Sequence, residues 1–220
     1  IAHEPVRVGR GYCVEHYGEG EAYLPVLQAL SAICRDGLDK ELLGIIAKHA
    51  PTWILQLPSL LERVGADALR RDTLGATSDR MLREFVDLLE VISAREALVL
   101  VLEDLHWCDL ATLEVLSMVA RKCRSARLMV VGTYRKTDVE AGDARRRRLL
   151  LALLAQTGVD EYTLEELAAH EVRAFLEQRF DGAAFADELA LVLAQRTGGH
   201  PLFLTQAART SPAAASSTKA

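Results

Sequence analysis

No apolar stretch in this sequence is long enough to cross a membrane. A spanning helix needs roughly 20 consecutive apolar residues, and runs such as ALVLVL at 97–102 are far shorter. The beginning of the chain also lacks the basic and then apolar pattern of a secretory signal. These two absences exclude a membrane-embedded protein, and we expect a cytoplasmic one without a membrane partner.

An excess of positive charge is also missing. The 26 Lys and Arg residues are outnumbered by 31 Asp and Glu, which gives a net charge of −5. A mildly acidic surface binds nucleic acid poorly, so we expect no direct nucleic-acid contact from this segment. The basic run Arg145–Arg148 is the local exception, and we interpret it as the solvated beginning of a helix.

Cysteine is scarce and has no metal-binding pattern. The four cysteines form no C-x-x-C pair and have no histidine at zinc-finger spacing, which argues against a zinc site. Hydrophobic residues make up 50% of the chain, so it can bury a core without disulfides, and we expect reduced thiols.

The pattern that is present predicts an α/β fold with a parallel sheet. The run at 97–102 is apolar at every position, as in a strand covered on both faces. A helix over 110–123 and a second strand over 127–134 follow at the spacing of one strand–helix–strand unit. The two strands should therefore be parallel neighbours. Residues 6–14 predict a further strand.

Helices account for most of the remaining sequence. Residues 40–76 predict short helices broken at Pro51 and Pro58, and residues 78–93 predict a long amphipathic helix with Ser78 as its N-cap. The segment 161–164 could form a last strand, after which helices are expected at 169–180, at 185–196 and from Pro201. We therefore divide the chain into an α/β domain (1–164), a small helical module (165–208) and a disordered tail (209–220).

The strongest chemical signal is VLVLEDLHWCD at 99–109. Its apolar strand ends in two carboxylates, Glu103 and Asp104, at the strand end where α/β proteins bind ligands. One carboxylate could hold Mg²⁺ through water, and the other could orient or deprotonate an attacking water. The alternative is that both are surface acids at the end of a strand.

Two further segments carry polar or glycine patterns. The strand RLMVVGTYR ends in Thr133 and Arg135, and a hydroxyl with a planar guanidinium beside a Mg²⁺-binding carboxylate would suit a γ-phosphate sensor. The alternative is an arginine in solvent. In GGHPLFL at 198–204, two glycines precede Pro201 and would let the backbone approach a ligand. An ordinary connection between helices explains that segment equally well.

Together these segments resemble the STAND-type AAA ATPases, the P-loop NTPases of bacterial multidomain signalling regulators. VLVLEDLHWCD is similar to their Walker B region, GTYR to their sensor strand and GGHPLFL to their lid motif. The resemblance implies a partial three-layer P-loop NTPase domain with a helical lid, and ATP and Mg²⁺ as ligands. It places Glu103 at the Mg²⁺-bound water and Asp104 as catalytic base, although the two roles could be swapped. It also implies ATP contacts by Thr133, by Arg135 at the γ-phosphate and by Pro201 near the base.

One motif of that family is missing from the sequence. The phosphate-binding loop G-x-x-x-x-G-K-[ST] (Walker A) does not occur, because no glycine is followed by lysine. The chain begins at Ile1, so we expect a piece of a longer protein whose loop lies upstream. By itself the chain should bind Mg-ATP weakly or not at all. We also expect a missing strand beside the strand at 97–102, which would leave an apolar edge exposed.

These features predict a fragment of an ATP-binding and ATP-hydrolysing switch, from a signal-responsive transcriptional regulator or a cyclase-linked protein. Its partners would be ATP and ADP, neighbouring domains of the longer chain and, depending on nucleotide, further copies of itself. The first alternative is a non-catalytic interaction module that keeps the fold without using nucleotide. The second is a degenerate fragment without function.

Overall fold

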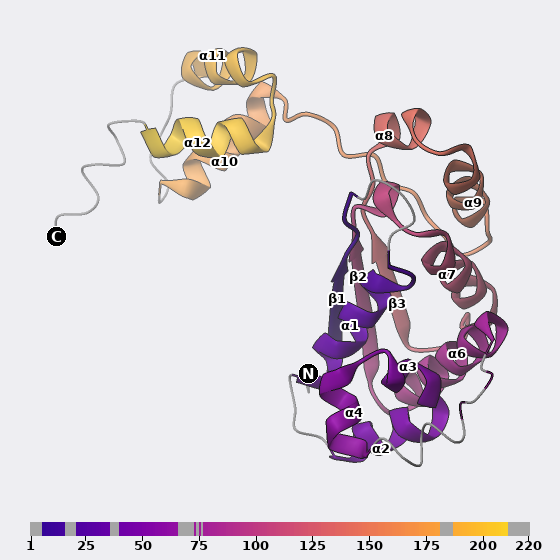
Figure 1. Cartoon of the computed structure of the whole chain (residues 1–220). Helices are drawn as coiled ribbons and strands as arrows, with labels where there is room; N and C mark the ends of the chain where they lie inside the picture. The colour runs from indigo at the N-terminus through magenta and orange to yellow at the C-terminus, as the bar shows by residue number, and fades with distance from the viewer. Residues whose placement is uncertain are drawn as a thin grey trace, which may run out of the picture. The chain divides into compact units, whose positions relative to one another are not determined.

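The computed structural model describes residues 6–15, 21–35, 40–65, 73, 75, 77–180 and 187–210 (Figure 1). The chain divides into two compact units, 1–160 and 161–220. Each unit has its own hydrophobic core. The mixed α/β architecture with a parallel sheet is confirmed in the first unit, and the described part of the second unit is helical.

The sheet of the first unit has three parallel strands in the order β1-β2-β3. They are β1 (Val6–Tyr12), β2 (Ala97–Glu103) and β3 (Leu128–Gly132). The predicted pairing of β2 with β3 is confirmed, with Leu100 opposite Val130. The expectation of an unpaired side on β2 is wrong, because β1 pairs along its whole length. The edges of the described sheet therefore lie on β1 and β3.

Helix α1 (Leu24–Arg35) packs on β1 at very short range. A Cβ atom added to Gly11 would overlap the carbonyl oxygen of Pro25, and one on Gly9 would lie 2.7 Å from the carbonyl oxygen of Ala29. The two glycines on this strand are therefore explained by the approach of the helix backbone. The inward side chains of β2 are buried beside them: Leu98, Leu100 and Leu102.

Further helices of the first unit follow, and all but α8 begin close to where the sequence patterns indicate. They are α2 (Lys40–His49), α3 (Pro51–Leu55), α4 (Pro58–Val64), α6 (Ser78–Arg95), α7 (Leu110–Lys122), α8 (Lys136–Ala141) and α9 (Ala144–Leu154). Pro51 and Pro58 each occupy the first turn of a helix. The N-cap of α6 is Thr77 rather than Ser78, since the Thr77 hydroxyl accepts a hydrogen bond from the Arg80 amide.

Helix α8 was not predicted from the sequence. Its six residues, KTDVEA, bury a single side chain, Val139. A helix this short shows no apolar periodicity, so residues 136–143 had the pattern of a polar loop. Helix α8 nevertheless contributes to the candidate site.

The second unit consists of α10 (Ala169–Arg179), α11 (Asp187–Thr197) and α12 (Pro201–Thr210). The predicted strand at 161–164 is wrong: these residues form no strand, and Leu164 is 95% exposed. Helix α12 includes residues 209 and 210, which had been assigned to the tail. The rest of that tail, 211–220, lies outside the described residues.

Candidate functional site at the carboxyl end of the sheet

Glu103 is the last residue of β2 and points to the face opposite the buried Leu102. Its carbonyl oxygen accepts a hydrogen bond from the amide of Cys13, which ties the ends of β1 and β2 together. Within the described residues, its carboxylate makes no hydrogen bond or ion pair. The backbone of Glu103 is therefore fixed while its carboxylate remains available to a ligand.

Asp104 follows with a left-handed backbone conformation (φ 60°, ψ 45°). This conformation costs a non-glycine residue roughly 1–2 kcal/mol. Two hydrogen bonds to Thr133 hold it: the Asp104 amide donates to the Thr133 hydroxyl (3.1 Å), and the Leu105 amide donates to the Thr133 carbonyl oxygen (2.8 Å). The structure thus brings together Asp104 and Thr133, two predicted site residues 29 positions apart.

Arg135 lies at the N-cap position of α8, close to the same strand end. Its guanidinium carbon is 5.6 Å from the centre of the Trp107 ring, a cation–π arrangement. One guanidinium nitrogen lies 3.5 Å from a carboxylate oxygen of Asp138, which itself belongs to α8. The Arg135 side chain is 63% exposed, so an anion could approach it from solvent.

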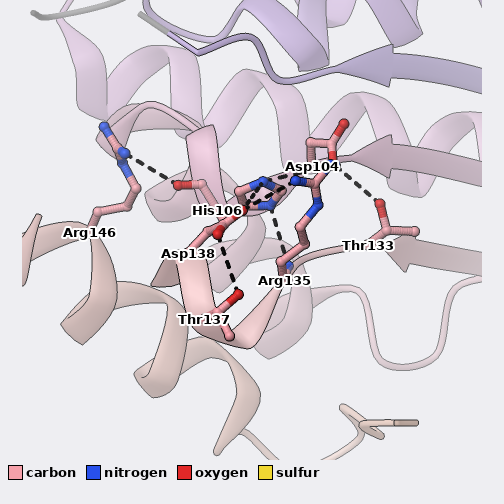
Figure 2. A network of polar contacts seen from close by, with 7 residues as sticks. All are labelled: Asp104, His106, Thr133, Arg135, Thr137, Asp138 and Arg146. Atoms are coloured by element: carbon pink, nitrogen blue, oxygen red, sulfur yellow. Dashed lines mark hydrogen bonds and ion pairs between the residues drawn. The ribbon is translucent and has the colours of Figure 1, made fainter. Parts of the chain in front are cut away.

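His106 was not among the site residues predicted from the sequence. It lies in the 3-10 turn Leu105–Trp107 and its side chain is completely buried. Its Nδ1 accepts a hydrogen bond from the Arg135 amide (3.4 Å). Its Nε2 lies 3.3 Å from Asp138 Oδ2 and 3.9 Å from Asp104 Oδ1 (Figure 2). The signal in the sequence that could have indicated it is a histidine two positions after the carboxylate pair.

Burial of His106 favours the neutral form of its ring. Burial lowers the pKa of His106 below its ordinary value, although the carboxylates of Asp104 and Asp138 act in the opposite direction. Since Nδ1 accepts a hydrogen bond, the single ring proton belongs on Nε2, which faces the two carboxylates. That N–H has no hydrogen-bond partner of good geometry among the described residues.

Arg146 on α9 completes the surroundings of His106. Its guanidinium donates a hydrogen bond to the His106 carbonyl oxygen (3.2 Å), and Figure 2 shows the two residues side by side. The helix begins where we expected it, capped by Asp143, whose carboxylate accepts from the Arg146 amide. Arg146 is nevertheless half-buried, so the interpretation of the whole basic run as solvated is wrong for this residue.

Pro201 belongs to the second unit, where it begins α12. Gly198 and Gly199 precede it in left-handed conformations (φ 61° and 70°) and end α11. The expected turn between two helices is thus present. A contact of Pro201 with ATP remains a prediction.

The carboxylates, the hydroxyl and the guanidinium therefore gather at the carboxyl ends of two adjacent parallel strands, where α/β proteins bind ligands. The sequence model of the AAA ATPase domain matches residues 1–131, more than half of the chain. The chain belongs to this AAA ATPase domain family. No curated protein and no solved structure matches it. The family match includes Glu103 and Asp104 and ends before Thr133.

Membership of the AAA family makes this a P-loop NTPase domain with a nucleotide-dependent activity in general. Proteins of this family generally use ATP with Mg²⁺. The described residues hold no cluster of three or more His, Cys, Asp or Glu that could form a protein-only metal cage. Mg²⁺ instead prefers one or two carboxylates together with water and phosphate oxygens, and Glu103 with Asp104 fits that donor set. Among the helices described, none has the length and apolarity to cross a membrane.

Proposed function

We propose that this AAA domain is part of an ATP-hydrolysing switch of the STAND type, within a larger signalling regulator. The observation that supports it most is the meeting of Asp104 with Thr133 at the ends of neighbouring parallel strands. Glu103 and Arg135 are adjacent to them in sequence. Two acids and a guanidinium at the carboxyl ends of adjacent strands are among the groups that phosphoryl transfer to water uses, together with a phosphate-binding loop.

The two carboxylates would have different tasks. Glu103, whose carboxylate has no partner among the described side chains, would hold Mg²⁺ through water. The bound ion would neutralise charge on the phosphate oxygens. Asp104 would accept a proton from the attacking water, because its carboxylate is fixed by a constrained backbone and is 37% exposed. The exchange of these two roles is the alternative.

Arg135 and Thr133 would act on the phosphate side. The planar donor fork of Arg135 matches a γ-phosphate, and its exposed guanidinium is free to turn toward one. Thr133 would act mainly by fixing the Asp104 backbone, since its hydroxyl already accepts the Asp104 amide proton. Pro201 would lie near the nucleotide base, as its place in the lid-like motif GGHPLFL suggests.

The test is ATP hydrolysis by the full-length gene product with Glu103→Gln and Asp104→Asn made separately. Loss of a general base lowers kcat by about 100-fold or more, so Asp104→Asn should do so with little change in KM. Glu103→Gln should raise the Mg²⁺ concentration needed for half-maximal rate. Interchanged effects would swap the two roles. Unchanged rates in both variants would refute the site.

The exposed Glu140 offers a matched control. It lies on α8, near the site but with its side chain in solvent, and Glu140→Gln removes the same charge. Its rate should equal that of the wild type. The region of the gene upstream of the Ile1 codon should also encode an in-frame G-x-x-x-x-G-K-[ST] loop, because the proposal needs the backbone cradle and lysine of that loop. A start codon nearby without such a loop would favour the non-catalytic module.

The second unit has a surface that suits contacts with other domains. Five of its exposed large apolar residues lie on α11 and α12: Leu189, Leu191, Val192, Leu202 and Phe203. Exposed apolar clusters commonly mark interaction sites. This observation favours contacts with neighbouring domains or with a second copy, whether or not nucleotide is hydrolysed. Sedimentation of the full-length protein with ATP and with ADP would show whether such association depends on nucleotide.

A further inference from the structure

The Nε2–H group of His106 is buried and has no hydrogen-bond partner among the described residues. Buried polar groups are nearly always hydrogen-bonded, and an unpaired one usually indicates strain or a functional role. Two carboxylate oxygens face this nitrogen from different elements. Asp138 Oδ2 on α8 is 3.3 Å away, and Asp104 Oδ1 at the end of β2 is 3.9 Å away.

The second ring nitrogen of His106 already has a hydrogen-bond partner. Nδ1 accepts from the amide of Arg135, at the start of α8. The His106 carbonyl oxygen accepts from Arg146 on α9. The imidazole therefore cannot turn away from the carboxylates without losing its contact with the residue that begins α8. A small shift of either carboxylate would complete a hydrogen bond to Nε2.

We propose that His106 is a positioning residue of the ATPase site: its ring N–H lies between the carboxylates of Asp104 and Asp138, and a hydrogen bond that a small shift completes couples the Asp104 carboxylate to helix α8. This inference rests on the proposed function, in which Asp104 acts on the attacking water. His106 touches neither nucleotide nor water and acts through Asp104. Asp138 in turn acts through His106, and it also contacts Arg135.

The first test needs no ATPase activity. Long-range ¹H–¹⁵N spectra of the ¹⁵N-histidine-labelled chain at neutral pH report which ring nitrogen carries the proton, and a His106→Gln sample assigns the signal. We expect His106 as the Nε2–H tautomer. Any other pattern overturns the proposal, and this outcome is independent of whether the protein hydrolyses ATP.

The second test separates a polar role from packing, in the full-length gene product. His106→Phe keeps an aromatic ring in the buried space but has no N–H, whereas His106→Gln restores a side-chain donor. Loss of a group that orients a catalytic ligand typically lowers activity by about 10-fold or more. We expect that fall in kcat for the Phe variant with KM for ATP nearly unchanged, and partial recovery in the Gln variant. A folded Phe variant with wild-type kcat would overturn the proposal.

If the Phe variant does not fold, a substitution at the more exposed Asp138 tests the proposal. The Asp138 side chain is 37% exposed, so Asp138→Ala, which removes the acceptor, should fold and should lower kcat, whereas Glu140→Ala on the same helix should not. Equal rates for these two variants would overturn the coupling to α8. If the full-length protein proves inactive before any substitution, the proposed function fails, and the tautomer measurement then tests the geometry alone.

Discussion

The hydroxyl oxygen of Thr133 lies 3.1 Å from the amide nitrogen of Asp104 and accepts its hydrogen bond. This bond joins the end of β3 to the residue that leaves β2 in a left-handed conformation. A non-glycine residue keeps such a conformation only when its surroundings impose it. Thr133 is therefore the side chain that sets the direction of the Asp104 carboxylate.

Replacing Thr133 with valine should reduce stability, while serine should not. Valine has nearly the same shape but cannot accept the Asp104 amide proton, and a lost hydrogen bond of this kind costs about 0.5–1.5 kcal/mol. Serine keeps the hydroxyl. Urea denaturation of the chain measures both variants. Equal unfolding free energies for Val and Ser would show that the hydroxyl does not constrain Asp104.

The parallel pairing of β2 and β3 could be predicted because an all-apolar strand, a helix and a second strand followed one another at a fixed spacing. The same argument predicted that Glu103, Asp104, Thr133 and Arg135 lie at the carboxyl ends of these two strands. The roles of His106 and Asp138 could not be predicted in this way. His106 is buried in a short turn and Asp138 lies on a six-residue helix, and neither segment is long enough to show a period. Their meeting depends on tertiary packing.

The buried Glu84 on α6 should contribute to stability through the groups that its carboxylate binds. Its carboxylate accepts hydrogen bonds from the amide (2.9 Å) and the hydroxyl (3.0 Å) of Thr52, at the start of α3, and pairs with Arg80. Removing one partner leaves buried polar groups unpaired, at roughly 1–3 kcal/mol for each group.

We therefore expect Glu84→Ala to lower the free energy of unfolding by at least about 2 kcal/mol, and Glu84→Gln to lower it less, because the amide oxygen still accepts. Glu90→Ala is the control, since Glu90 is exposed on the same helix and surface changes stay within about 0.5 kcal/mol. Denaturant titrations compare the three. A Glu84→Ala variant as stable as the control would contradict this assignment.

The buried cysteines should make the fold sensitive to alkali. Burial raises the pKa of Cys34 to about 11, and that of Cys123 also to about 11. An unfolded cysteine loses its proton near pH 8.5, so between these values the unfolded state binds fewer protons than the native state. Stability is then fully present below about pH 8.5 and falls as pH rises toward 11.

Two measurements test the behaviour of these thiols. Unfolding free energies at pH 8 and pH 10 should differ less in a Cys34→Ala, Cys123→Ala double variant than in the wild type. At pH 8 a disulfide reagent should react slowly with the native chain and rapidly with all four thiols in denaturant. Rapid reaction of Cys34 in the folded chain would show that it is not buried as described.

Gly198 and Gly199 should differ sharply in their tolerance of alanine, although both have a positive φ. At Gly198 a Cβ would meet nothing closer than 3.9 Å, so Gly198→Ala costs only the backbone strain of about 1–2 kcal/mol. At Gly199 a Cβ would lie 2.8 Å from the Leu167 amide nitrogen and closer still to its carbonyl oxygen. It would thus disrupt the hydrogen bond from the Leu167 amide to the Gly199 carbonyl oxygen.

Because overpacking adds roughly 1–3 kcal/mol to the strain, Gly199→Ala should open the second unit while leaving the first intact. Amide hydrogen exchange distinguishes these effects, since protection should fall in α10, α11 and α12 but not in β2. Gly198→Ala should show a smaller loss in the same helices. If both variants lost protection equally, the turn would be governed by backbone conformation alone, and the close approach of Leu167 would not constrain it.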